Sequence, residues 1–118
     1  MYIYNAFVDR VVDGDTYDVQ IDLGFNMFMK SVRLRLRGVD TPETWRPTTE
    51  AEREHGERAT KFVKELIEGE FVKIKSYKLG IYGRYEADVF VEDEQGNSID
   101  LGQLLTDNDF VKLDSYED

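Results

Sequence analysis

The chain has 118 residues, 41% of them hydrophobic and 34% charged, a composition typical of one folded domain and not of a disordered chain. It contains no cysteine, which excludes a disulfide framework and thiolate metal sites. Its first residues, MYIYNAFVDR, lack the features of a signal peptide, and no segment approaches the roughly 20 apolar residues of a membrane span.

These features predict a single domain over residues 1–118, with a core of about residues 2–113. We expect a cytoplasmic protein without a membrane partner, and secretion is left open if the chain is a mature fragment.

The net charge of the chain limits which binding partners it can have. Fifteen Lys and Arg against 25 Asp and Glu give a net charge of −10, which argues against tight nonspecific binding to phosphate backbones. Net charge does not fix local charge, however, because a few arginines and a divalent cation can reverse the sign inside one cleft. The acidic total therefore leaves a local phosphate site open.

The first third of the chain predicts an antiparallel meander. Residues 2–12 are rich in aromatic and β-branched side chains and end at a turn over residues 13–15. A second strand follows from residue 16 to about residue 23, and residues 25–31 are a connection or the start of the third strand. In residues 32–37 apolar side chains alternate with arginines, which indicates one face in a core and one outside it.

The middle of the chain predicts a helix over about residues 57–68. Its apolar stripe has the i, i+3, i+4, i+7, i+8 spacing of an amphipathic helix and consists of Ala59, Phe62, Val63, Leu66 and Ile67. Gly69 suits its C-terminal cap, and Thr49 with Glu52 resembles a capping box. Whether the helix extends back to Thr49 is open at this stage.

Two more strands and a short helix complete the predicted order. The strands run from Phe71 to Tyr77 and from Tyr85 to Glu92, and Asp100 is the expected N-cap of a short helix. The acidic tail LDSYED is expected to fray. The order β-β-β-α-β-β-α predicts a β-barrel with helices (α+β), a five-stranded OB fold with two helices. The fold alone does not name a function.

Two turns carry carboxylates. Asp15 begins the second strand and is the better placed of the two acids in Asp13-Gly14-Asp15. In Asp40-Thr41-Pro42-Glu43 the proline restricts the backbone, so that both carboxylates and the Thr41 carbonyl have defined directions. Carboxylates and carbonyls favour hard cations such as Ca²⁺, Mg²⁺ or Mn²⁺. Either turn is also compatible with a plain solvated turn.

Two arginines are candidate phosphate ligands. Arg35 leads into the acidic turn, whereas Arg33 and Arg37 are expected to form an ordinary solvent face. Arg84, in the sequence Tyr-Gly-Arg, directly precedes a strand that can aim its guanidinium, and Tyr82 offers a ring for base stacking. A plain turn is the alternative for that motif.

Other conspicuous residues receive structural roles. His55, the single histidine, is expected on the surface with no catalytic role, and Trp45 as a partly buried lid on the acidic turn. Lys73, Lys75 and Lys78 are expected on a solvated strand face.

Taken together and in this order, the motifs resemble the staphylococcal nuclease-like (thermonuclease) family. That family is recognised by Asp-Gly-Asp-Thr, then Arg-x4-Asp-Thr-Pro-Glu, then Tyr-Gly-Arg, which here occupy residues 13–16, 35–43 and 82–84. The resemblance extends from about Val11 to Lys112 and includes both predicted helices.

The resemblance implies a Ca²⁺-dependent phosphodiesterase that cuts the P–O5′ bond of DNA or RNA and leaves 3′-phosphates. Its implied roles are metal ligation by Asp15, Asp40 and the Thr41 carbonyl, general-base catalysis by Glu43, phosphate binding by Arg35 and Arg84, and base stacking by Tyr82. The expected partner is single-stranded DNA or RNA, bound by a monomer.

The chain also departs from the best-known member of the family. That protein is basic, with a lysine-rich loop after the acidic turn, whereas TWRPTTEAEREHGE here is acidic overall, and the C-terminal end is truncated with Tyr116 as its one tyrosine. Two alternatives therefore stand beside the enzyme. They are a catalytically weak or inactive OB-fold module that binds nucleic acid, and a protein-interaction domain with a structural Ca²⁺.

Overall fold

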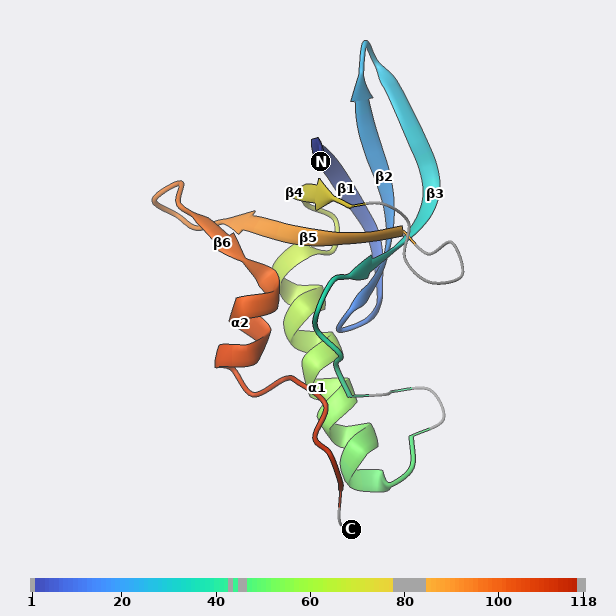
Figure 1. Ribbon diagram of the computed structural model, residues 1–118, viewed down its shortest axis with the longest axis vertical. Coiled ribbons are helices and arrows are strands. Elements are labelled where there is room, and N and C mark those ends of the chain that lie inside the picture. Colours follow the sequence, from blue (N-terminus) through green and yellow to red (C-terminus); the bar gives the residue numbers. More distant parts are fainter. Residues whose placement is uncertain (1, 43, 45–46, 78–84, 117–118) are drawn as a thin grey trace.

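The computed structural model describes residues 2–42, 44, 47–77 and 85–116 of the chain. In this described part the strands are β1 (Tyr2–Asp13), β2 (Thr16–Gly24), β3 (Met27–Leu36), β4 (Phe71–Ser76), β5 (Tyr85–Glu92) and β6 (Ser98–Asp100). The helices are α1 (Glu50–Ile67), between β3 and β4, and α2 (Leu101–Asp107), after β6 (Figure 1).

The strands close into a barrel because β1 and β3 each have two partners. The second half of β1 pairs with β2, and its first half, from Tyr2 to Phe7, pairs with β4. At the far side β3 pairs in parallel with β5, with Leu34–Leu36 opposite Tyr85–Ala87. The resulting circuit β1-β2-β3-β5-β4 confirms the predicted five-stranded OB barrel. The short β6 pairs with β5 outside this circuit and was not predicted.

The core follows the predicted alternation. The apolar side chains of β2 and β3 that face inward are buried, as are those of β4 and β5, and α1 covers this core with Ala59, Val63 and Ile67. The inward-facing residues of the four strands include Tyr17, Val19, Ile21, Val32, Leu34, Leu36, Val72, Ile74, Ala87 and Val89. Alternation at period two therefore placed the arginines of β3 on the outer surface of the barrel.

The helix α1 begins earlier than its apolar stripe indicates. Thr49 is its N-cap, and the Thr49 hydroxyl accepts a hydrogen bond of 3.0 Å from the Glu52 amide, which settles the open start in favour of the capping residue. At the other end Gly69 has a φ of 78°, as a C-terminal cap requires. Its amide donates to the Val8 carbonyl at 2.8 Å and so ties the end of α1 to β1.

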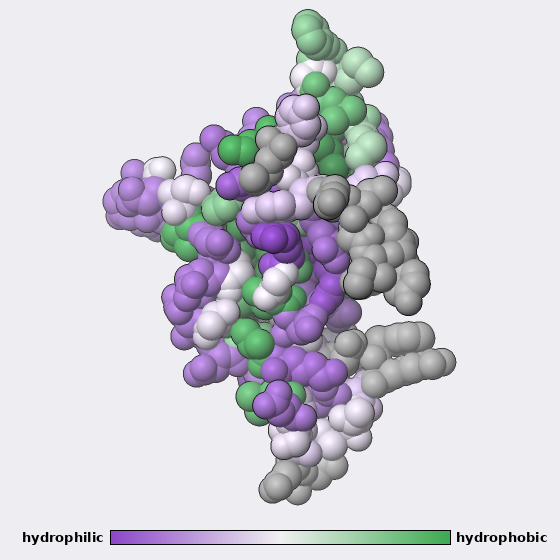
Figure 2. Space-filling model, in the orientation of Figure 1, coloured by the Kyte–Doolittle hydropathy of each residue, from purple (hydrophilic) through white to green (hydrophobic). Residues whose placement is uncertain are grey.

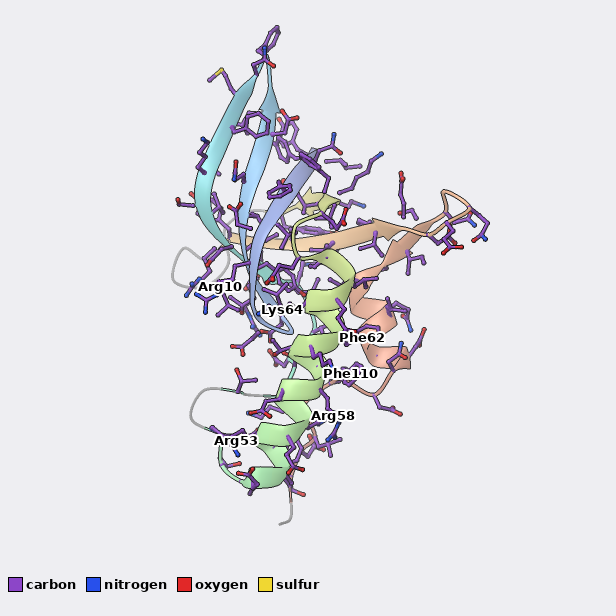
Figure 3. The ribbon with its side chains drawn as sticks, turned by 180° about the vertical axis from the view of Figure 1, so that it is seen from behind. Arg10, Arg53, Arg58, Phe62, Lys64 and Phe110 are labelled. Atoms are coloured by element: carbon purple, nitrogen blue, oxygen red, sulfur yellow. The ribbon has the colours of Figure 1, made fainter. Side chains whose placement is uncertain are left out.

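Two expectations about the C-terminal region are wrong. Instead of lying on the surface, His55 is buried, and its Nε2 donates to the Asp109 carbonyl at 2.7 Å. The tail, which was expected to fray, packs against the domain as far as Tyr116, whose hydroxyl lies 2.7 Å from His55 Nδ1. The rings of Phe62 and Phe110 pack beside this contact with centroids 5.0 Å apart (Figure 3). An aromatic cluster thus docks the tail on α1.

The β2–β3 hairpin projects beyond the barrel and carries an apolar tip (Figures 1 and 2). Residues 25–31 prove to be both turn and strand, because Phe25 and Asn26 form the turn, with φ values of 54° and 60°, and β3 starts at Met27. A bulge at Ser31, with φ 59°, shifts the register between Val32 and Met29. Phe25 is 98% exposed. Neither described helix has the length and hydropathy that crossing a membrane requires.

Changing the hairpin turn to Asn-Gly, by Phe25→Asn with Asn26→Gly, should stabilise the protein by about 1 kcal/mol. A two-residue turn with both φ values positive favours Asn-Gly, whereas phenylalanine is strained there. Urea denaturation measures the free energy of unfolding. Phe25→Ala is the control, since it removes the exposed ring and retains a residue unsuited to positive φ. Equal stability of both variants would contradict a strained turn.

Candidate functional site

The site forms where two turns approach at one end of the barrel. One is the β1–β2 turn around Gly14, and the other is the segment of residues 38–42 that leaves β3. A Cβ atom on Gly14 would lie 2.9 Å from the side chain of Thr41, closer than real Cβ contacts allow. Glycine at this position therefore permits the two turns to touch, and this close approach was not part of the sequence prediction.

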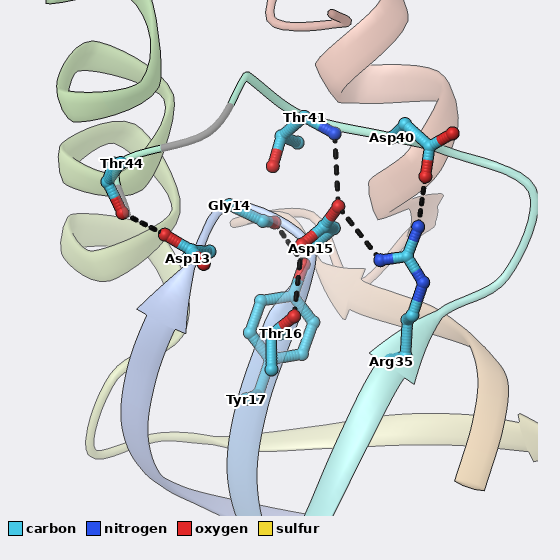
Figure 4. A network of polar contacts seen from close by, with 9 residues as sticks. All are labelled: Asp13, Gly14, Asp15, Thr16, Tyr17, Arg35, Asp40, Thr41 and Thr44. Atoms are coloured by element: carbon cyan, nitrogen blue, oxygen red, sulfur yellow. Dashed lines mark hydrogen bonds and ion pairs between the residues drawn. The ribbon is translucent and has the colours of Figure 1, made fainter. Parts of the chain in front are cut away.

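Asp15 is the centre of the polar contacts (Figure 4). It is 7% exposed, and its Oδ2 accepts hydrogen bonds of 3.1 Å from Arg35 Nη1 and from the Thr41 amide. Its Oδ1 accepts from the Thr16 hydroxyl at 3.0 Å. All of the described partners of this buried carboxylate are hydrogen-bond donors.

Arg35 joins the two acidic turns. It lies opposite Thr16 in the β2–β3 register, and its guanidinium contacts Asp15 through Nη1 and Asp40 through Nη2. Asp15 is buried, whereas the side chain of Asp40 is 71% exposed. One guanidinium thus balances two carboxylates, and the three groups together carry a formal charge of −1. The predicted proximity of Arg35, Asp15 and Asp40 is present in the structure.

Asp13, the other acid of the first turn, has a different environment. It points away from Arg35 and accepts a hydrogen bond from the Thr44 hydroxyl (Figure 4). Partial burial raises the pKa of Asp13, and the Thr44 hydrogen bond offsets this increase only in part, while the charge of Asp15 adds a smaller increase. Ionised Asp13 therefore costs the folded state some stability at neutral pH.

Tyr17 supports the turn from below. Its ring is buried in the barrel, and its hydroxyl donates to the Gly14 carbonyl at 2.5 Å. Burial, together with the nearby charge of Asp15, raises the pKa of Tyr17 well above its ordinary value, so the hydroxyl keeps its proton and remains a donor. The alternation of β2 predicted a buried Tyr17, but not this hydrogen bond.

The two arginines on either side of Arg35, Arg33 in β3 and Arg37 just after it, are surface residues, as expected. Arg33 pairs with Asp18 at 2.9 Å and its side chain is 62% exposed. Arg37 is exposed too, and its guanidinium carbon lies 3.9 Å from the centroid of the Tyr77 ring, a cation–π contact worth about 0.5–1 kcal/mol at an exposed site. Neither contacts the carboxylates that Arg35 joins.

Four residues with predicted roles lie outside the described residues, and their roles stay predictions. They are Glu43, Trp45, Tyr82 and Arg84. Lys78 lies outside as well, and of the other two lysines assigned to a solvated face, Lys73 is exposed and Lys75 is half-buried.

The site offers oxygen ligands of the kind that hard cations prefer. Asp15 and Asp40 contribute carboxylates, and nothing in the described chain donates a hydrogen bond to the Thr41 carbonyl. The Thr41 hydroxyl oxygen is buried without a described partner. The described residues hold no cluster of three or more His, Cys, Asp or Glu side chains suited to a metal ion. The donor types therefore fit a hard cation, with two carboxylates that Arg35 already balances.

The sequence patterns did not predict two contacts of the site. Thr44 bonds Asp13 across 31 positions of sequence, and the amide of Lys112 donates to the Asp40 carbonyl at 2.8 Å. Neither residue stands in a motif. Thr44 follows the acidic turn directly, which was its only signal, and a backbone amide such as that of Lys112 leaves no trace in a sequence.

The fold and the site together define the class of the protein, an OB barrel that carries an arginine between two carboxylates at its rim. Residues 33–107 match the family model described as staphylococcal nuclease homologue. The chain is 36% identical over 92 residues to a thermonuclease of Staphylococcus intermedius and 37% identical over 92 residues to a thermonuclease of Staphylococcus hyicus. It belongs to the family of staphylococcal nuclease homologues.

The matches cover 76% of this chain but 51% and 50% of the two relatives. The matched part of the chain thus corresponds to about half the length of the curated thermonucleases. Family membership is shown, while the activity of the whole relatives does not transfer with it.

Replacing each of the two acids of the first turn by asparagine should change the stability of the protein differently. Asp15→Asn should destabilise the protein by about 1–3 kcal/mol, because its new NH₂ group faces donors only and the charge pair with Arg35 is lost. Asp13→Asn keeps an oxygen for Thr44 and should be neutral or stabilising at pH 7, since a raised pKa means that ionisation opposes folding.

Urea denaturation of both variants at pH 7 tests this difference. The raised pKa also fixes the pH window: the favourable contribution of Asp13 is present below its unfolded value of 3.8 and is lost as the pH rises through its folded value. Equal destabilisation by the two substitutions would show that the two carboxylates are equivalent.

Proposed function

We propose that this chain is a Ca²⁺-dependent nuclease domain, which hydrolyses DNA or RNA at the P–O5′ bond and leaves 3′-phosphates. The observation that carries the proposal is the guanidinium of Arg35 held between Asp15 and Asp40 at the rim of the barrel. Membership of the staphylococcal nuclease homologue family supports it. Single-stranded nucleic acid is the proposed substrate of a monomeric, cytoplasmic protein.

Arg35 is the proposed phosphate ligand among the described residues. Attack of water on a phosphodiester builds negative charge on the phosphoryl oxygens, and a planar guanidinium that stays charged can donate to two of them. Its contact with buried Asp15 fixes its direction before substrate arrives. Loss of one such preorganised donor typically costs roughly 2.7–4 kcal/mol of transition-state stabilisation.

The carboxylates and the Thr41 carbonyl are the proposed metal ligands. Asp40 is largely exposed and therefore accessible from solvent, while Asp15 forms the buried wall of the site. When bound there, Ca²⁺ would supply positive charge near the phosphoryl oxygens and a more acidic water. Arg35 contacts both carboxylates, so it and the metal ion would share the same carboxylate oxygens. The positive charge of Arg35 should therefore weaken metal binding in the absence of substrate.

The other proposed roles rest on the family resemblance. Glu43 is the proposed general base for the attacking water, Arg84 the second phosphate ligand and Tyr82 the stacking residue. All three fall inside residues 33–107, the range that matches the family. A carboxylate within reach of the water is the type of group that the reaction needs.

The net charge of −10 favours a second candidate function. The alternative is a catalytically weak or inactive OB-fold module that binds nucleic acid or protein. Because an acidic surface weakens binding to phosphate backbones, the charge supports the protein-interaction form of this module. The two functions differ in whether cleavage accompanies binding, and this is what the experiment below measures.

Purified protein is incubated with single-stranded DNA and with RNA, in Ca²⁺, Mg²⁺ or EDTA. We expect cleavage in Ca²⁺ alone, and Arg35→Ala, Glu43→Gln and Arg84→Ala should each reduce it by about 100-fold or more. Arg33→Ala is the matched control, because Arg33 lies on the same strand and its ion pair, among the described residues, is with the half-buried Asp18 outside the site. It should retain cleavage.

Each other outcome has a definite meaning. Binding without cleavage supports the nucleic-acid-binding module. Neither binding nor cleavage, with Ca²⁺ still raising the melting temperature, supports the protein-interaction domain. Equal loss of cleavage in Arg33→Ala and Arg35→Ala would remove the assigned role of Arg35.

A further inference from the structure

One peptide group connects the two carboxylate-bearing turns, and hydrogen bonds hold it at both ends. This is the peptide between Asp40 and Thr41. Its carbonyl oxygen, on Asp40, accepts from the Lys112 amide at 2.8 Å, and its N–H, on Thr41, donates to Asp15 Oδ2 at 3.1 Å. Because a peptide is planar and trans, its C=O and N–H point in opposite directions, and fixing one fixes the other.

The backbone around this peptide has few other restraints. The ladder of β3 ends at Leu36, and Gly38 has a φ of 76°. Among the described residues, the two bonds above are the backbone hydrogen bonds of residues 38–42. Pro42 biases Thr41 toward an extended backbone but does not itself set the rotation of the Asp40–Thr41 peptide plane. The described hydrogen bonds that orient this plane come from Lys112 and Asp15.

The side chain of Lys112 also contacts α1. Its ammonium lies 3.5 Å from Oε2 of Glu52, a buried residue in the first turn of α1. Hydrogen bonds from Thr48, foremost from its amide, lower the pKa of Glu52, with Lys112 contributing, so this carboxylate stays ionised. The contacts of His55 with Asp109 and Tyr116 fix the chain on both sides of Lys112.

We propose that Lys112 is a positioning residue of the site, and that its backbone N–H holds the Asp40–Thr41 peptide so that the Thr41 N–H reaches Asp15. This hydrogen bond sets the separation of the Asp15 and Asp40 carboxylates before any ligand binds. The C-terminal segment is then a part of the site architecture and not a dispensable tail. The proposal rests on the proposed function only for its effect on catalysis.

The test compares Lys112→Pro with Lys112→Ala in the full chain. Both remove the contact with Glu52, and only proline removes the N–H. Amide hydrogen exchange, followed by NMR, measures the exchange rate of the Thr41 N–H directly. We expect Thr41 to exchange at least about tenfold faster in Lys112→Pro than in Lys112→Ala, with the core amides of Val19 and Val89 unchanged.

Val111→Pro is a second control, since no described partner accepts from the Val111 amide. It introduces the same ring into the same segment and should leave Thr41 protected. For catalysis, kcat of Lys112→Pro should fall roughly tenfold or more below that of Lys112→Ala with KM changed little, because misplaced groups affect the chemical step more than binding. Because an unfolded fraction would also lower the apparent kcat at unchanged KM, the rate is referred to the folded fraction of each variant.

Equal Thr41 exchange in Lys112→Pro and Lys112→Ala would overturn the proposal. If Lys112→Pro does not fold, native-state exchange of the wild type decides. Coupled opening predicts the same opening free energy for the Thr41 and Lys112 amides, and a Thr41 amide that opens while Lys112 stays protected would overturn it. Failure of the nuclease proposal is a separate outcome, because these exchange measurements need no substrate and no cleavage.

Discussion

The structure of the site depends on one guanidinium between two carboxylates. Arg35 contacts buried Asp15 and exposed Asp40, which come from two different turns. Without that cation, two like charges would face each other at the barrel rim, which the protein tolerates only with a proton or another cation. In the proposed function, the same guanidinium binds the incoming phosphate and shares carboxylate oxygens with the metal ion. Charge balance between the carboxylates and phosphate binding would then be tasks of a single residue.

Three parts of the fold hold the groups of this interaction in place. Closure of the barrel through β3 and β5 fixes the strand that carries Arg35. Gly14 lets the first turn approach Thr41 without a steric clash, and the Tyr17 hydroxyl holds that turn from inside the barrel. The C-terminal segment, docked on α1 through His55, reaches the Asp40 carbonyl from the opposite side. The site thus rests on parts of the chain that are distant in sequence, which suits a preorganised centre.

Local patterns predicted the barrel and half of the site. Alternation in β3 placed Leu34 inside and Arg35 outside, and the motif spacing placed Asp15 and Asp40 near Arg35. What the sequence did not predict depends on long-range contacts. His55 is buried because Tyr116 and Asp109 satisfy both ring nitrogens, which its polar neighbours in sequence conceal. The bond from Lys112 to Asp40 involves backbone atoms only. The three residues of β6 are too few to show a period of two.

The most direct measurement is a calorimetric titration of Ca²⁺ into the wild type and Arg35→Gln without nucleic acid. If Arg35 balances carboxylates that otherwise bind the cation, its removal leaves Asp15 and Asp40 uncompensated and should tighten Ca²⁺ binding on the order of tenfold. Arg33→Gln, whose partner Asp18 is outside the site, should bind Ca²⁺ as the wild type does. Binding that is unchanged or weaker in Arg35→Gln would contradict the account, because Arg35 and the metal would then not share the same oxygens.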